Sequence, residues 1–313
     1  MTQEKSRINL ILRFGLGLLI FIGIVVVLGK SGGVEQLLNI QWQKGFRVVL
    51  WTFALQTTAS LRWHLLLRGF TEKGDFVTLL KFMVFGRAAG HSSSLIAGDL
   101  GSRYVYLKSM EIDMKRGTAA IFLDKLFEAI LFFSVLVLFF GMVFSETIAS
   151  RPFIPLLLAS LLFLVAMIFL PFSLAFLGKI FKKREILIQM KGMVKGRVLP
   201  VFFLLTLAKY SISAARFASI MSLSGIDLSY IKVFMGTSLA QAGLILGFTP
   251  GGLGFLEAGW AGALHFFGVP AEETARFLVS QRLLIFASVL FLAFLFIVYD
   301  RLTKKYKLRN SNE

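Results

Sequence analysis

The apolar segments constrain this chain more than any other feature. Six of them approach or exceed the roughly 20 residues that a helix needs to cross a bilayer. We predict full transmembrane helices over residues 9–29, 46–67, 118–143, 152–173, 199–223 and 272–299. No small-residue cleavage site follows the first segment, so we interpret it as a retained span. The sequence therefore predicts an all-α polytopic membrane protein, with residues 1–313 in a single membrane domain.

The composition agrees with this class of protein. Hydrophobic residues make up 57% of the chain, charged residues make up 16%, and the mean hydropathy is +0.78. A formal net charge of +17 would suggest nucleic-acid binding in a soluble protein, but here the cations lie in loops, where they orient spans. The chain has no Cys, and its three His residues lack zinc-ligand spacing. We therefore expect no nucleic-acid partner, no metal and no cofactor.

Two additional apolar segments, residues 77–97 and 231–249, are interrupted in a way that ordinary spans are not. The first contains Lys81, Arg87 and His91, which are unfavourable on a helix that faces lipid. The second ends in Thr-Pro-Gly-Gly, where proline lacks a backbone donor and glycine tolerates positive φ angles. We predict that both segments are re-entrant broken helices.

A short glycine motif follows each interrupted segment. Residues 98–101 read GDLG and residues 251–254 read GGLG, 153 positions apart. Paired broken helices at matching positions of two halves are typical of a transporter binding site. The glycines are expected to free backbone N–H groups where a half-helix begins, and helix N-termini attract anions. For the second motif we predict a half-helix over residues 255–267, which Gly268 ends.

The distribution of cations predicts the topology. Lys and Arg are concentrated near the N-terminus, in residues 103–116, in residues 179–197 and in a C-terminal tail over 300–313. The positive-inside rule places all these segments, and therefore both termini, on the cytoplasmic side of the cell membrane. The first interrupted segment then enters and leaves the membrane from the cytoplasm, and the second does so from the opposite side.

This topology divides the chain into two halves, residues 1–143 and 152–299. Each half has three full crossings and one re-entrant segment, so the halves form an inverted repeat. An Arg followed by an aromatic residue recurs at Arg62 and Arg216, 154 positions apart. An acid or amide followed by a base and Leu recurs from Asp124 and Gln281, 157 positions apart. The similar offsets indicate a duplication, with purely structural glycines as the alternative to a binding role.

Two longer runs carry a resemblance to a known family. The run GDLGSRYVYLKSMEIDMKRGTAAIFLDKLFEAI and the run TPGGLGFLEAGWAGALHFFGVPAEETARFLVSQRLL resemble two motifs of the lysylphosphatidylglycerol synthase transmembrane region, a flippase-like family. Where the first motif usually has Glu, this chain has Asp99 nearby, and Asp124-Lys125 replaces the usual Glu-Arg pair. Only residues 300–313 follow the last predicted span, so we expect a free-standing member without the aminoacyl-transferase domain.

The resemblance implies a lipid flippase that moves a phospholipid or a polyprenyl lipid between leaflets. The phospholipid would include aminoacylated phosphatidylglycerol. The expected partners are membrane lipids, with anionic phospholipid or polyprenyl phosphate foremost, and either a second copy or a lipid-synthase partner. A secondary transporter of an ion or small polar solute, and an accessory subunit of a lipid or glycan synthase, are the alternatives. No nucleophile–base–acid set emerges, so we predict no enzyme activity and no catalytic residue. A membrane-embedded transferase that uses Asp124, Glu128 and Glu257 is the alternative.

Ionisable residues inside apolar spans are candidate site residues, because each costs about 2.5–3.5 kcal/mol at a helix centre. Arg62 and Arg216 either bind a lipid phosphate or extend to the membrane interface. Lys209 lies near the middle of its span, where we expect an internal acidic partner or a bound headgroup. Asp124 and Glu128 share one helical face, and Lys125 is placed for an i,i+3 ion pair with Glu128, so these three form either a structural cluster or part of the site.

The remaining candidates follow the two glycine motifs. Glu257 either binds a cationic headgroup, such as a lysyl amine, or pairs with Arg282. Arg103 either binds phosphate or obeys the positive-inside rule. The complete predicted substrate-binding set is Arg62, Asp99, Arg103, Asp124, Lys125, Glu128, Lys209, Arg216, Gly251, Gly252, Gly254, Glu257 and Arg282.

Overall fold

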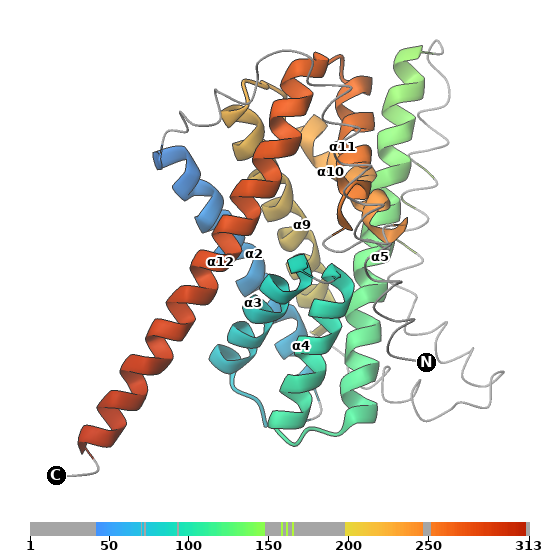
Figure 1. Cartoon of the computed structure of the whole chain (residues 1–313). Helices are drawn as coiled ribbons and strands as arrows, with labels where there is room; N and C mark the ends of the chain where they lie inside the picture. The colour runs from blue at the N-terminus through green and yellow to red at the C-terminus, as the bar shows by residue number, and fades with distance from the viewer. Residues whose placement is uncertain are drawn as a thin grey trace, which may run out of the picture.

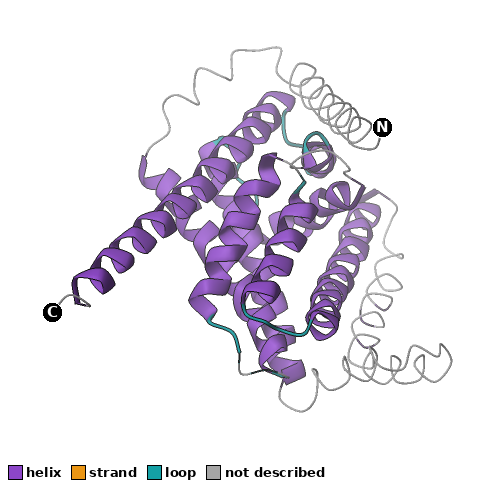
Figure 2. Cartoon of the chain, turned by 60° about the horizontal axis from the view of Figure 1, so that its bottom comes forward, coloured by secondary structure: helices purple, strands orange, loops and turns teal. Residues whose placement is uncertain are grey.

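The structure is a computed structural model of the whole chain. It describes residues 42–69, 71, 73–92, 94–147, 158, 161, 165, 198–246 and 252–310. The predicted span 9–29 and nearly all of 152–173 lie outside these residues. The described chain forms helices and loops without a strand (Figure 2). The helices are α2 (Trp42–Arg68), α3 (Phe76–Ser92), α4 (Leu95–Ser109), α5 (Met114–Thr147), α9 (Val198–Leu223), α10 (Tyr230–Leu246), α11 (Phe255–Phe266) and α12 (Ala271–Asn310).

Three of the described helices are long and apolar enough to cross a membrane. They are α5 over Met114–Val143, α9 over its whole length and α12 over Ala271–Thr303. Large apolar side chains such as Phe122 and Phe294 are exposed on them, as expected where lipid is the solvent. The all-α multi-pass membrane architecture is therefore confirmed.

α2 overlaps the predicted span 46–67 but is not among these three helices. Its 27 residues extend about 40 Å at 1.5 Å per residue, which is long enough to span. Its polar side chains lower its hydropathy, and those of Thr52, Gln56, Ser60 and Arg62 are buried. α2 is therefore a central helix that turns its polar face toward the protein.

The order and length of the helices repeat along the chain. α3 and α10 both have 17 residues and begin 154 positions apart, at residues 76 and 230. α2 and α9 have 27 and 26 residues and begin 156 positions apart, at residues 42 and 198. Each half therefore contains a long helix, a two-helix hairpin and a second long helix, in that order.

The two hairpins, α3–α4 and α10–α11, lie at opposite ends of the bundle (Figure 1). Both ends of α3–α4 lie together, because Lys73 before α3 pairs with Glu111 after α4 at 3.6 Å. Both ends of α10–α11 also meet, since Lys232 lies over the ring of Phe267 at 5.7 Å. This arrangement is what an inverted repeat of re-entrant hairpins requires, and the membrane position of each hairpin stays a prediction.

The halves interlock through these hairpins. α3 packs on α12 of the other half, through Leu80 and Val84 against Leu292 and Ala293. α10 packs on α5 in the corresponding way, and α2 packs along α9 at the centre. The interior between the halves is therefore built from both, and polar residues of α2 and α9 face it.

The first glycine motif lies inside a helix, contrary to our prediction that it precedes one. α4 begins at Leu95, where the Ser94 hydroxyl accepts a hydrogen bond from the N–H of Ala97. Gly98 faces α3 so closely that a Cβ there would overlap the backbone of Gly86 and Gly90. Gly98 therefore serves close helix packing, as small residues do between membrane helices.

The second glycine motif precedes a half-helix, as predicted. Gly254, at φ 83°, is the N-cap of α11, and the helix ends at Phe266, two residues before Gly268 at φ 72°. These positive angles favour glycine. α12 continues without interruption to Asn310, and so extends into the basic segment that follows the predicted span 272–299.

Candidate functional site

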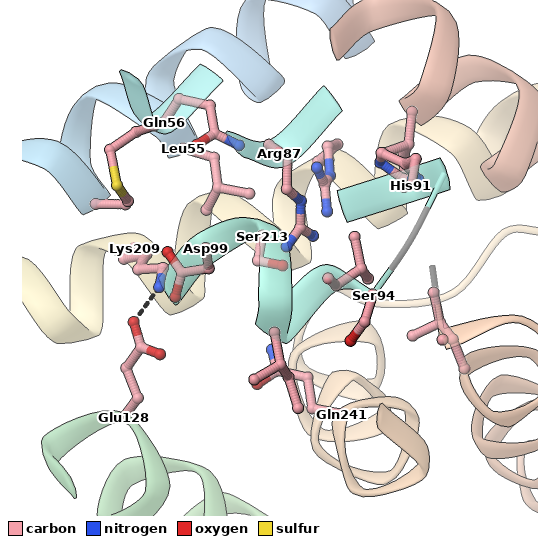
Figure 3. A pocket seen from close by; sticks show the side chains of 18 of the residues that line it. Leu55, Gln56, Arg87, His91, Ser94, Asp99, Glu128, Lys209, Ser213 and Gln241 are labelled. Carbon is pink, nitrogen blue, oxygen red and sulfur yellow. Dashed lines mark hydrogen bonds and ion pairs between the residues drawn. The ribbon is translucent and has the colours of Figure 1, made fainter. Parts of the chain in front are cut away.

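A cavity of about 420 Å³ lies at the centre of the bundle, where helices of both halves meet (Figure 3). Arg87 and His91 of α3 and Lys209 of α9 reach it from different helices. Ionisable groups buried at the centre of a membrane-protein bundle are candidate substrate ligands. Eight residues of the predicted set line it, namely Asp99, Arg103, Lys125, Glu128, Lys209, Arg216, Gly252 and Arg282.

Asp124 forms the buried centre of an ion-pair network beside the cavity. Its carboxylate lies 2.9 Å from Nη2 of Arg62 and 2.7 Å from Nη2 of Arg103, and none of the three side chains is more than 1% exposed. Arg62 therefore does not extend to the membrane interface, and neither Arg62 nor Asp124 lines the cavity. Arg103 is likewise held by internal acids, because its Nε donates to Asp99 at 3.1 Å.

Glu128 pairs with three cations at the cavity wall. It accepts from Nη1 of Arg62 at 2.6 Å, from Nζ of Lys125 at 3.3 Å and from Nζ of Lys209 (Figure 3). The predicted i,i+3 pair of Lys125 and Glu128 and the internal acidic partner of Lys209 are both confirmed. Lys125 also pairs with Asp99 at 2.6 Å, so α4, α5 and α9 are joined by charge.

Glu257 holds the start of α11 against α12. Its Oε2 accepts from the N–H of Gly254 at 2.8 Å and from Nη2 of Arg282 at 3.0 Å, and its Oε1 pairs with Nε of Arg282. Nη2 of Arg282 also donates to the carbonyl of Gly252 at 2.9 Å. Glu257 is fully buried, and its pair with Arg282 confirms that predicted contact.

The glycines of the second motif support this arrangement from the backbone. Gly252 lines the cavity, and Gly252 and Gly254 adopt φ angles of 65° and 83°. These angles let the chain turn sharply enough to bring one carbonyl and one N–H toward Arg282 and Glu257. Gly251, which we also predicted, lies outside the described residues.

Arg216 differs from the other predicted arginines, because no described acidic side chain pairs with it. It is 3% exposed, and its Nε and Nη1 have no hydrogen-bond partner among the described residues. Its guanidinium lies 5.2 Å from the ring centroid of Phe217, a cation–π contact that replaces only part of a counter-ion's effect. Arg216 is therefore a buried cation that faces the cavity with unused donors.

The predicted set missed several polar residues of the cavity wall. Arg87 and His91 belong to the interrupted segment 77–97. Their polarity within that apolar segment was the signal that could have assigned them to the cavity wall. Gln281 is fully buried, and neither its amide nitrogen nor its amide oxygen has a described partner. Its position as the repeat counterpart of Asp124 was the available signal. The other missed polar residues are Gln56, Ser94, Ser213 and Gln241.

Apolar side chains form the rest of the wall and the mouth of the cavity. Met83, Phe132 and Ile285 line its interior. Ile96 and Leu100 of α4 also line it while 55% and 40% of their surface is exposed, so the cavity reaches the molecular surface beside α4. The mouth is therefore apolar and the floor is charged, an arrangement that matches an amphipathic ligand. The described residues contain no cluster of three or more metal-binding side chains.

Comparison with known proteins identifies one family. The model of one family, described as the lysylphosphatidylglycerol synthase TM region, matches residues 14–299. A comparison with curated proteins found no match. The matched range covers every residue that lines the cavity, and the family resemblance predicted from the two motifs is confirmed.

Proposed function

Because the chain belongs to the lysylphosphatidylglycerol synthase transmembrane-region family, we propose that it moves a phosphate-bearing lipid between the leaflets of the membrane. Family membership supports a membrane lipid-related function in general. Translocation is the specific activity that the central cavity favours, because a headgroup crossing hydrocarbon needs polar partners at depth.

The observation that carries the proposal is the excess of positive charge around a cavity with an apolar mouth. Among the described residues, six cations and two carboxylates line the cavity, and adding the buried Arg62, Asp124 and Glu257 gives seven cations and four carboxylates. A phosphate would reduce this excess of three charges, and arginine binds phosphate bidentately. Acyl chains would leave beside Ile96 and Leu100, where the mouth meets the surface.

The repeated architecture supports a route to both leaflets. The cavity lies between two similar halves whose hairpins are at opposite ends of the bundle (Figure 1). In transporters built from inverted repeats, the two halves rock around a fixed central site and expose it to each side in turn. We propose the same alternation for this chain, with both termini on the cytoplasmic side.

A lipid-translocation assay tests the proposal. The full chain is reconstituted into liposomes that carry fluorescent phospholipids or polyprenyl phosphate, and a membrane-impermeant quencher reports the fraction of label in the outer leaflet. We expect protein-dependent exchange of at least one phosphate-bearing lipid, and slower exchange with Lys209→Met, which removes a cavity-lining cation. Lys232→Met, on α10 outside the cavity, is the matched control. Protein-free exchange rates for every lipid, with correctly folded protein, would refute lipid translocation.

A further inference from the structure

We propose that Arg87, Arg216 and Gln281 form a site for a phosphate anion, and that this site accepts an anionic lipid headgroup and rejects an aminoacylated, cationic one. The inference rests on the proposed function only in taking the ligand to be a lipid. It names the charge class of substrate, which family membership leaves open.

The first argument is that every carboxylate at or beside the cavity already has a cationic partner. Asp99 pairs with Lys125 at 2.6 Å and Asp124 pairs with Arg103 at 2.7 Å. Glu128 accepts from three cations, and Glu257 accepts from Arg282 and from a backbone N–H. A lysyl ammonium entering this cavity would find no described carboxylate free to receive it, and it would add positive charge to a site already in excess.

The second argument comes from the difference between the two repeats. In the first half, Arg62 is neutralised by Asp124 at 2.9 Å. Its counterpart Arg216 is just as deeply buried, but the counterpart of Asp124 is Gln281, whose amide carries no charge. The described part of the second half therefore keeps the cation and lacks the fixed counter-ion. Unpaired buried charge is unfavourable, so a ligand that supplies the missing negative charge is bound there.

The third argument concerns the neighbours of Arg216. Arg87 lines the same cavity as Arg216, and no ion pair joins it to a described acid. Its Nε has no hydrogen-bond partner among the described residues, and His91 of the same helix also lines the cavity. Clustered arginines with unused N–H donors are the usual protein partners of phosphate, since their planar forks match its oxygens.

Gln281 completes the site through hydrogen bonding. Its side chain is fully buried against the cavity, and both polar atoms lack a partner in the described part of the chain. The amide nitrogen can donate to a phosphate oxygen without adding charge. Leaving such a buried group unsatisfied is costly, and a bound phosphate would remove that cost.

The test measures binding separately from transport. Purified full-length protein is presented with phosphatidylglycerol, lysylphosphatidylglycerol and phosphatidylcholine, and with glycerol 3-phosphate as a soluble phosphate. Binding is read by native mass spectrometry and by thermal stabilisation in detergent. We expect phosphatidylglycerol to bind at least about tenfold more tightly than the lysyl lipid. Its phosphate forms a charge-assisted interaction with the arginines, whereas the lysyl ammonium is repelled by the same cations.

Two variants locate the site. Gln281→Glu supplies Arg216 with the counter-ion that Asp124 gives Arg62, so we expect it to keep its fold and to lose phosphatidylglycerol binding by about tenfold or more. Arg216→Gln removes the cation and is expected to lose binding similarly. Gln43→Glu makes the same chemical change on the exposed part of α2 and is expected to bind as the unaltered chain does.

The outcomes separate this inference from the proposed function. Equal or tighter binding of lysylphosphatidylglycerol, or normal phosphatidylglycerol binding by Gln281→Glu, overturns the anion site even if lipids are translocated. Selective, Arg216-dependent binding of phosphatidylglycerol without translocation of any lipid supports the anion site and overturns the flippase. Stabilisation by glycerol 3-phosphate but not by phosphatidylglycerol supports a phosphate site and overturns its assignment to lipid.

Discussion

The substitution Asp124→Asn gives the sharpest test of how this bundle is held together. Asp124 on α5 lies between Arg62 on α2 and Arg103 on α4, with all three side chains excluded from solvent. Asparagine keeps the size of the side chain and removes its charge. The change therefore affects electrostatics at the junction of three helices while leaving packing almost unchanged.

The magnitude follows from the two distances. At an effective dielectric constant of about 20, unit charges separated by 2.9 and 2.7 Å attract by about 6 kcal/mol in each pair. Part of this attraction offsets the cost of burying the ions, and each arginine keeps a second acid, Glu128 for Arg62 and Asp99 for Arg103. The net loss is then about 3–5 kcal/mol, as for removal of one partner of a buried pair. At roughly 2 °C per kcal/mol for a chain of this size, Tm falls by about 6–10 °C.

Thermal unfolding of the purified protein in detergent, followed by size-exclusion chromatography after heating, measures this shift. Asp227→Asn is the matched control, because Asp227 is exposed in the loop before α10, and it is expected to change stability by less than about 0.5 kcal/mol. In the double variant Asp124→Asn/Arg103→Gln we expect a loss smaller than the sum of the single losses. A Tm for Asp124→Asn equal to that of Asp227→Asn, or strictly additive losses, would refute the coupled network.

Three other predictions concern the first half of the chain. Gly98→Ala should separate α3 from α4 and lower Tm by several degrees. In Gly101→Ala, in the same motif, the added Cβ meets no atom within 4 Å, so this control should be neutral or stabilising by up to about 1 kcal/mol. Equal effects of the two substitutions would contradict the close-packing role of Gly98. Asp75 accepts from the Thr78 N–H at 2.7 Å, and hydrogen bonds from the Thr78 side chain and backbone lower its pKa from the ordinary value. Its contribution is therefore complete above the unfolded-state pKa and is lost as pH falls through the lower folded-state pKa. Tm should therefore fall below about pH 4 less steeply in Asp75→Asn than in the unaltered chain. Identical pH profiles would exclude this charge-dependent contribution. Because the chain has no Cys, the variants Lys73→Cys and Glu111→Cys each carry a single thiol that an impermeant maleimide can label. Both thiols should react from the same side of the membrane. Labelling from opposite sides would show that α3 and α4 together cross the membrane.

The sequence by itself determined the class of protein, the repeat and the family. Apolar segments near 20 residues long permit little except membrane helices, because backbone polar groups must be satisfied within the segment. The repeat offset near 154 residues was readable from Arg62 and Arg216 and reappears in the starts of α3 and α10. Local backbone chemistry also predicted α11, since Gly254 and Gly268 adopt the positive φ angles that glycine favours.

Only the tertiary structure decided which of the described buried charges are paired with an opposite charge and which are not. In the sequence Arg62 and Arg216 are equivalent, yet Arg62 meets two carboxylates and Arg216 meets none among the described residues. The two glycine motifs look alike, yet Gly98 packs inside α4 and Gly254 caps α11. Ion pairing depends on distances of a few ångströms between residues that are tens of positions apart, and such distances are set by how the helices pack. The sequence therefore reveals that polar groups lie within apolar segments, and the fold decides which of them remain available to a ligand.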